Sequence, residues 1–235
     1  MLAALDRDRL ALVATMSLTF VTGVVDAVGF LALDRVFTGN MTGNIVILGM
    51  GVAGADELPV LGPAVALVAF TAAAWAAGLV LRKPRSLDPP GWHHRVTVLL
   101  SVGALALTVL TVVAAFTGSD AGPLLKVVLA ATTAAVMGQQ AVAARAVAVA
   151  DMTTVVVTST LASLAGETWP RGGRGAVFNR RLGAIVTIFA GALVGALLLR
   201  IHVAVPFGLA AALTAGTAWL GHLRLSPRAA LTSTG

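Results

Sequence analysis

Long apolar runs recur from one end of this 235-residue chain to the other, and they constrain its fold more than any other feature. A helix needs about 20 apolar residues to cross a hydrocarbon layer of about 30 Å. Only 11% of the residues are charged, against about 25% in soluble domains. Runs of spanning length lie near 9–33, 59–81, 96–116, 124–149, 182–200 and 203–221. The sequence therefore predicts an all-α integral membrane protein, a single polytopic membrane domain over residues 1–235 with about six transmembrane helices.

Two further segments, near 36–54 and 151–166, are too short for a comfortable span. Both begin with threonine-rich polar sequence and end with a short apolar run, "IVILGMGVAG" in the first and "LASLAG" in the second. They are either additional crossings or re-entrant segments that enter and leave the membrane on one side.

The positive charges decide between these alternatives. Lys and Arg residues cluster in 82–95, in 171–181 and near both termini. Two crossing segments would place the two internal clusters on opposite faces, against the positive-inside tendency. Two re-entrant segments place every cluster on the cytoplasmic face, with the acidic linkers at Asp56, Glu57 and Asp120 outside. We therefore expect two re-entrant segments and two cytoplasmic termini.

The first short segment opens with the octet "FTGNMTGN", residues 37–44. Eight extended residues are long enough to descend about 15 Å to the bilayer midplane. A half-helix from Asn44 to Gly54 would then climb back, with Thr42 or Asn40 as its N-cap. Non-helical backbone at this depth is tolerated only where it is buried in protein or lines a water-filled cavity. The octet therefore marks such a place.

The second half of the chain resembles the first. "GVVDAVGF" at 23–30 and "GQQAVAAR" at 138–145 both lead into threonine-rich breaks. Three spans in each half would make a 3+3 inverted repeat, with repeat one at about 9–116 and repeat two at about 124–221. Inverted repeats with broken helices are typical of secondary transporters. The alternative is that helices rich in Ala and Val resemble one another by chance.

The same residues carry a family resemblance. "VDAVGFL" with "FTGNMTGN", and "GQQAVAAR" with "TTVVVTSTLASLA", resemble the two signature regions of the YoaK-like bacterial membrane protein family (domain of unknown function 1275). Gln140 and Ser159 depart from that pattern, where the family tends to have asparagine and glycine. The resemblance implies a bacterial inner-membrane protein and says little about a substrate.

Asp26 is the sharpest single candidate for function, because it lies in an otherwise apolar helix. A carboxylate at the centre of a membrane helix costs at least about 2.5 kcal/mol on insertion scales. One interpretation is a proton- or cation-coupling site beside the octet. The other is a structural carboxylate that accepts hydrogen bonds from the helix break, or one near enough to the outer interface to be hydrated.

The polar residues of the two breaks form the second candidate group. Two half-helix N-termini that converge near the midplane would offer N–H groups to an anionic or carbonyl-bearing ligand. The alternative is that these side chains only satisfy the broken backbone. Gln140 lies at the level of Asp26 in the other half and joins this group. The expected substrate-binding residues are Thr38, Asn40, Thr42, Gly43, Asn44, Gln140, Thr154, Thr158 and Thr160.

Other residues have simpler explanations. Lys126 and Arg200, at the ends of spans, are expected to extend to the membrane surface. Gly191 and Gly195 predict close helix packing, within one protomer or in a homo-oligomer. The chain has no cysteine and no HExxH or GxSxG pattern, so we expect no enzyme activity, no metal and no cofactor. The net charge of +6 is explained by membrane topology, and we expect no nucleic-acid partner.

These features predict a transporter of a small molecule or ion. The convergent helix N-termini favour an anion or a carboxylate as its substrate, and Asp26 favours coupling to a proton or a cation. Membrane lipids are its expected surroundings. Two alternatives stay open: a membrane module that binds a lipid or a partner protein without transport, and a passive channel.

Overall fold

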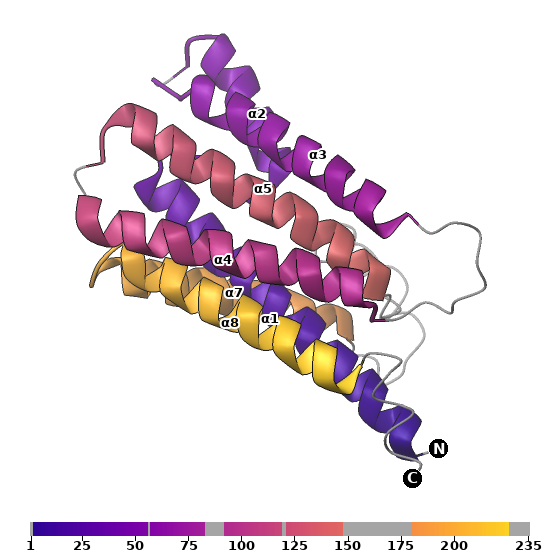
Figure 1. Cartoon of the computed structure of the whole chain (residues 1–235). Coiled ribbons are helices and arrows are strands. Elements are labelled where there is room, and N and C mark those ends of the chain that lie inside the picture. Colours follow the sequence, from indigo (N-terminus) through magenta and orange to yellow (C-terminus); the bar gives the residue numbers. More distant parts are fainter. Residues whose placement is uncertain (1, 56, 83–91, 119–120, 148–179, 226–235) are drawn as a thin grey trace, which may run out of the picture.

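The computed structural model describes residues 2–55, 57–82, 92–118, 121–147 and 180–225. Within these ranges the chain folds into seven α-helices and no strand (Figure 1). The helices are α1 (Leu2–Ala32), α2 (Met41–Val52), α3 (Leu61–Leu81), α4 (His94–Thr117), α5 (Pro123–Val147), α7 (Arg180–Leu199) and α8 (Ala204–Arg224). All of these except α2 are long and apolar enough to cross a membrane. The predicted all-α architecture with six long apolar helices is confirmed.

The ends of these helices lie close to the limits of the apolar runs. The run expected at 59–81 is α3, Leu61–Leu81, and the run at 182–200 is α7, Arg180–Leu199. The exception is α1, which begins at Leu2, although its membrane-length portion begins only at Asp8. Hydropathy marks the portion that can lie in lipid, and a helix is free to continue beyond it into water.

Helices from both halves of the chain alternate in the bundle. The most extensive contacts are those of α3 with α5, of α1 with α7 and of α4 with α8. Smaller contacts join α1 to α8 and α4 to α5, and α1 also contacts α5. Buried side chains of α1, α4, α5 and α8 form the main apolar core, for example Val24, Leu107, Ala134 and Phe207. The helices α3 and α7 lie at the periphery of the bundle.

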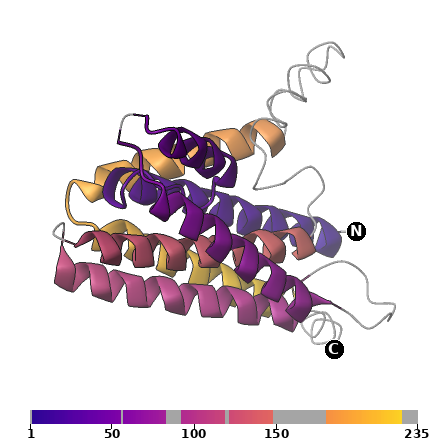
Figure 2. The ribbon, with the colours of Figure 1, turned by 90° about the horizontal axis from the view of Figure 1, so that it is seen from above.

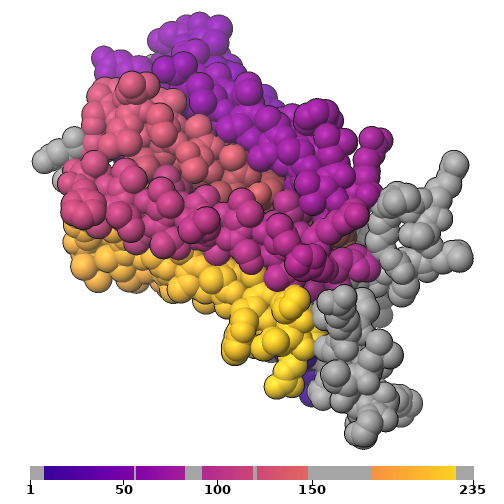
Figure 3. All heavy atoms as spheres, in the orientation of Figure 1, coloured from indigo at the N-terminus to yellow at the C-terminus, as the bar shows by residue number. Residues whose placement is uncertain are grey.

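The outer surface of the bundle is apolar. In Figure 3 the helices α3, α4, α5 and α8 lie side by side along one face. Along α4 the exposed large apolar side chains recur at nearly every turn: Val98, Val102, Leu105, Val109, Val112 and Phe116. A surface of this kind is stable against lipid tails and not against water. The chain is therefore a multi-pass membrane protein.

Glycines allow the closest helix crossings. A side chain at Gly138 of α5 would collide with the backbone of Phe70 in α3, and one at Gly23 of α1 would collide with the backbone of Ile188 in α7. Gly191 and Gly195 of α7 lie in the same way against the backbone of α1. This pair of glycines therefore packs within the protomer, which resolves one of the two alternatives left by the sequence.

The chain leaves α1 and enters α3 at the same end of the bundle (Figure 1). Val36, just beyond α1, contacts Gly29 of α1 and lies close to Gly62 at the start of α3. The short helix α2 packs against α3 at this end (Figures 1 and 2), and its Gly51 contacts the chain at Leu58 just before α3. Consequently α1 and α3 run in opposite directions, with α2 between them in the sequence.

Candidate functional site

A tight reversal after α1 directs the octet back toward Asp26. Asp34 and Arg35 both adopt left-handed backbone conformations, with φ of 63° and 56°. The backbone N–H groups of Leu33 and Val36 both donate to the carbonyl of Gly29, at 3.2 Å. The carbonyl oxygen of Val36 lies where a side chain of residue 29 would be, so only glycine lets the chain return so close to α1. The octet therefore runs alongside the last turns of α1.

The carboxylate of Asp26 holds the octet in place. Its Oδ1 accepts the backbone N–H of Thr38 at 2.8 Å and of Gly39 at 2.6 Å. The N–H of Asn40 and the hydroxyl of Thr38 lie farther from the same oxygen, both at 3.4 Å. Successive backbone N–H groups that point at one atom form an anion-binding concavity. In this protein the anion is a side chain of the adjoining helix.

The other oxygen of Asp26 is differently placed. Among the residues that the structure describes, none donates a hydrogen bond to Oδ2. A side chain at Gly39 would lie 3.4 Å from Oδ2 and only 2.6 Å from Cγ2 of Thr22. The half-buried Asp26 therefore uses one oxygen for the loop. The second oxygen is left to take a proton or a ligand.

Asn44 fixes the other side of the octet. Its side-chain oxygen accepts the N–H of Phe37 at 2.8 Å, and its amide nitrogen donates to the carbonyl of Phe37 at 2.6 Å. Asn44 is fully buried. The side chain of Asn44 thus supplies the hydrogen-bond partners that the backbone N–H and carbonyl of Phe37 would have in a regular helix or strand. The ring of Phe37 stacks on Phe30 at 5.0 Å between centroids and covers Gly43.

Asn40 begins the half-helix. Its side-chain oxygen accepts the N–H of Gly43 at 3.2 Å, which makes it the N-cap of α2. Asn40 was one of the two expected caps, and α2 begins at Met41 rather than at Asn44 for this reason. Asp26 lies six residues before the end of α1, about 9 Å along the helix. The octet therefore reaches the level of Asp26 along α1.

Gln140 continues the polar region toward the middle of the bundle. Its amide nitrogen donates to the carbonyl of Leu18 at 3.1 Å and lies 3.4 Å from the hydroxyl oxygen of Thr22. Its side-chain oxygen, Oε1, is buried and has no hydrogen-bond partner among the described residues. Thr22 is one helical turn before Asp26, so Gln140, Thr22 and Asp26 follow one another along the contact of α1 with α5.

The structure separates the expected substrate residues into groups. Thr38 and Asn44 are buried, and their polar atoms are engaged with Asp26 and Phe37. Asn40 and Thr42 are exposed. Thr42 shares the outward face of α2 with exposed apolar residues such as Ile45. The expected second break, 151–166, with Thr154, Thr158 and Thr160, lies outside the described residues.

Sequence reasoning overlooked three contributors to this site. Thr22 contacts both Gln140 and Gly39, and its position one turn before Asp26 was a signal that could have identified it. Gly39 donates the shortest hydrogen bond to Asp26. Gly29 admits the returning chain, a role that depends on a contact between distant residues and leaves no local signal.

The arrangement suits binding of an anion or a proton. Thr38 and Gly39 present adjacent N–H groups that any carboxylate could accept, and Asp26 can carry a proton when it releases them. Within the described ranges, no group of three or more His, Cys, Asp or Glu residues could hold a metal ion. The geometry of Asp26 fits a structural anchor, and it also fits an anchor that is released on protonation.

Comparisons with known proteins agree with a membrane protein of unresolved function. A family model described as "Protein of unknown function (DUF1275)" matches residues 14–220. The chain is similar to the UPF0700 transmembrane protein YoaK of Bacillus subtilis (strain 168), with 32% identity over 147 residues. That match covers 63% of this chain and 62% of the relative, so it spans less than two thirds of the relative's length. No solved structure matches the chain.

Proposed function

The chain belongs to the DUF1275 family of proteins of unknown function, and we propose that it is a secondary transporter of a small solute in a bacterial inner membrane. In this proposal the two halves of the chain form an inverted repeat, and the solute passes between them by alternating access. Both termini would be cytoplasmic. The end of the bundle at which α1 finishes would then face outward, and we call it the outer end.

The pattern of helix contacts is the observation that carries this proposal. The contacts are nearly unchanged when each helix of the first half is exchanged with one of the second half: α1 with α5, α3 with α7 and α4 with α8. This exchange turns the α1–α7 contact into the α5–α3 contact. The same exchange turns α1–α8 into α5–α4 and α3–α4 into α7–α8, and it leaves α1–α5 and α4–α8 unchanged. Since α1 and α5 run in opposite directions (Figure 1), the relation that this exchange supports is an inverted one.

The glycine crossings give this relation a register. Gly23 and Gly138 begin the two sequence segments that resemble each other, and each meets the backbone of the helix that the exchange assigns to it. The contacted residues, Ile188 and Phe70, would then be equivalent. Sequence resemblance and packing thus both support the same pairing of the two halves.

The octet and α2 would form the first re-entrant segment, entering from the outer end. The segment 151–166 would be its inverted counterpart on the cytoplasmic side. Re-entrant backbone needs protein partners, because the lipid offers none. Asp26 and Asn44 supply such partners for the first segment.

Asp26 would couple the solute to a proton. An ionised Asp26 occupies the N–H groups of Thr38 and Gly39. A protonated Asp26 is a weaker acceptor, because charge-assisted hydrogen bonds are about twice as strong as neutral ones. The N–H groups would then be free for a carboxylate or another anionic solute. Proton and anion would therefore enter together. Protonation of Asp26 frees the N–H groups for the anion, and an anion bound to those N–H groups favours the protonated form of Asp26.

The remaining expected substrate residues have roles in this scheme. Thr38, Asn40, Gly43 and Asn44 would shape the loop that receives the solute, and Oε1 of Gln140 would accept a hydrogen bond from an N–H or O–H group of the solute. Thr42 would contribute only on the outward face of α2. Thr154, Thr158 and Thr160 would complete the site from the second break.

Solute-driven proton flux tests the proposal, because a proton that enters together with a monovalent anion moves no net charge and is seen as a pH change rather than as a current. The purified protein, reconstituted on solid-supported membranes, is screened for current and pH change against small organic and inorganic anions. Asp26→Asn removes the charge but keeps an acceptor for the loop. Asp34→Asn is the matched control, because Asp34 is an exposed acid just beyond the same helix. We expect a saturable, proton-coupled signal in the wild type and in Asp34→Asn, and loss of proton coupling in Asp26→Asn.

Other results would favour the alternatives. Full proton coupling in Asp26→Asn would exclude Asp26 as the coupling group. Flux without saturation would indicate a passive channel. Silence across the panel, with the protein shown to be folded, would favour a module that binds a lipid or a partner protein without transport.

A further inference from the structure

A second polar region lies at the outer end of the bundle, away from Asp26. A cavity of about 640 Å³ opens there between the ends of α1, α5, α7 and α8. Its volume is in the range typical of small-ligand sites, about 300–1,000 Å³. Its walls include Leu33 at the end of α1, Leu129 on α5 and Leu199 on α7. The exposed side chains of Arg200 and Ile201 at its rim show that it reaches the surface. We call it the outer cavity.

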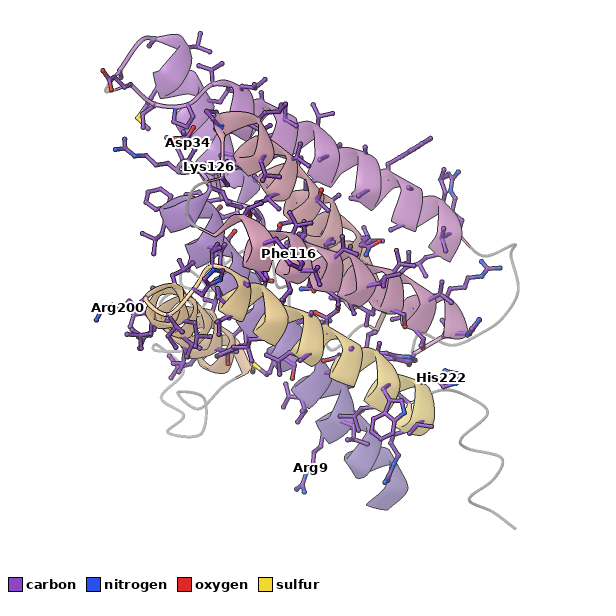
Figure 4. All side chains as sticks on the ribbon, turned by 60° about the vertical axis from the view of Figure 1, so that its left-hand side comes forward. Arg9, Asp34, Phe116, Lys126, Arg200 and His222 are labelled. Carbon is purple, nitrogen blue, oxygen red and sulfur yellow. The ribbon has the colours of Figure 1, made fainter. Side chains whose placement is uncertain are left out.

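Cationic side chains from two different helix ends line the outer cavity. Lys126 comes from the first turn of α5, and Arg200 follows the last residue of α7. Figure 4 shows both on the same side of the molecule, and it shows Arg9 and His222 at the opposite end. No Asp or Glu is among the described residues that line the cavity. A cleft lined by charge of one sign attracts the opposite charge more strongly than a flat surface does.

His202 adds a hydrogen-bond donor to the same cavity. Its Nδ1 accepts the backbone N–H of Ala204 at 3.2 Å, so in the neutral ring the hydrogen is on Nε2. That Nε2 lies 4.0 Å from the position that a side chain at Gly118 would take. Gly118 has a φ of 59° and also lines the cavity. Nε2 therefore lies on the side of the cavity where Gly118 carries no side chain.

The placement of these cations is unusual for a membrane protein. Most Lys and Arg residues of the described ranges lie at the other end of the bundle: Arg9, Arg82, Arg95, Arg145, Arg180 and Arg224. Cationic residues near spans are depleted from the outer face. Extension of a long side chain to the membrane surface explains one such residue at a helix end, but it does not explain why two of them line the same cavity.

We propose that the outer cavity binds an oxyanion of the phosphate class. Arg200 and Lys126 would neutralise it, and Nε2 of His202 would donate a further hydrogen bond. The apolar lower walls would accept a hydrocarbon portion of the same ligand. Such a group is found on soluble phosphates and on the headgroup of an anionic lipid, whose chains would lie along the exposed apolar surface beside Ile201.

Binding to the purified protein tests this inference directly, and it does not require transport. Radiolabelled inorganic phosphate is measured by equilibrium dialysis in a neutral detergent at fixed ionic strength. Phosphatidylglycerol is compared with phosphatidylcholine by native mass spectrometry. The variants are Lys126→Gln, Arg200→Gln and the double variant. Arg35→Gln is the matched control, because Arg35 is exposed near the same end but does not line the cavity.

We expect each single variant to weaken binding of the preferred probe about tenfold, in line with the loss of one charge-assisted hydrogen bond. The double variant should abolish binding, and Arg35→Gln should leave it unchanged. Loss of phosphate binding would assign the cavity to a soluble anion. Loss confined to phosphatidylglycerol would assign it to a lipid headgroup.

Other results would overturn the inference. The inference is wrong if the wild type binds neither probe. It is also wrong if the wild type and the double variant bind equally and unfold at the same temperature. If the double variant does not fold, Ala196→Phe fills the cavity from its wall and keeps both cations. Undiminished binding in that variant would contradict the proposed site.

Discussion

The crossing of α1 with α7 and the crossing of α3 with α5 use the same packing but carry different chemistry. Each places a glycine, Gly23 or Gly138, against a backbone carbonyl of the partner helix. Three residues after the glycine, α1 has Asp26, whereas α5 has Ala141. The two crossings are alike in their packing, but α5 has no carboxylate at the position that Asp26 takes in α1. In the proposed inverted repeat, the helices of both halves would move during transport, and only the first half would contribute a carboxylate at this position.

The difference extends to the neighbouring polar groups. In the first half, the polar atoms of Asn44 and Oδ1 of Asp26 have partners in the octet. On α5, Gln140 has a buried oxygen that has no partner in the part of the chain that the structure describes. A buried acceptor without a donor costs about 1–3 kcal/mol. Substitutions at Asn44, at the two glycine crossings, at Asn40 and at Gln140 test this contrast, from the largest expected effect to the smallest.

Asn44→Leu should have the largest effect on stability. It leaves the N–H and the carbonyl of Phe37 without partners in a buried position, which should lower the free energy of unfolding by about 2–4 kcal/mol. Thermal and dodecyl sulfate unfolding in neutral detergent measure the change. Thr42→Ala, at an exposed position of α2, should have almost no effect. Similar stabilities of the two variants would show that Asn44 does not hold the octet.

Gly138→Ala and Gly23→Ala should come next and should match each other. In both, the new methyl group collides with a backbone that cannot move alone, and overpacking of this kind costs about 1–3 kcal/mol. The same unfolding measurements apply. Gly78→Ala is the control, because a side chain there meets nothing within 4 Å and Ala favours the helix by about 1 kcal/mol. Tolerance of Ala at one crossing only would break the equivalence of the two halves.

Asn40→Ala should lower stability by about 1 kcal/mol, because α2 loses its N-cap. Asn40→Asp keeps the acceptor for the N–H of Gly43 and should restore most of the loss. The helical content measured by circular dichroism should change little in either variant. Equal losses in both variants would indicate that the cap is not the source of the effect.

Gln140→Leu should have the smallest effect on stability, within about 0.5 kcal/mol of the wild type. The lost bond from its amide nitrogen to Leu18 is offset by removal of the unpartnered oxygen. Under the proposed function, this variant should nevertheless reduce transport in the solid-supported membrane assay. A large loss of stability would show that Oε1 has a partner in the folded protein.

Much of the fold was readable from the sequence, and the reason is physical. A lipid environment imposes one length and one polarity on each spanning helix, so the limits of α3, α4 and α7 follow from apolar runs. Asn40 as a cap was also within reach, because capping depends on residues close together in the chain. The octet was identified as a break for the same reason.

The details of the site were not readable from the sequence. The bonds from Thr38 and Gly39 to Asp26 depend on a reversal at Asp34 and Arg35, two residues that seldom adopt left-handed conformations. The outer cavity brings Lys126 together with Arg200, which lie far apart in the chain. Contacts of this kind arise from packing between helices, and no local sequence pattern predicts them.

Access of water to the centre of the bundle tests the proposed mechanism most directly. The chain has no cysteine, so Thr22→Cys provides a single thiol beside Gln140 and Gly39. A membrane-impermeant thiol reagent is applied to right-side-out and to inverted vesicles, with Val102→Cys as a control that faces lipid. Alternating access predicts modification of Thr22→Cys from both sides and none of Val102→Cys. Modification of Thr22→Cys from neither side, or from one side only, would contradict the account.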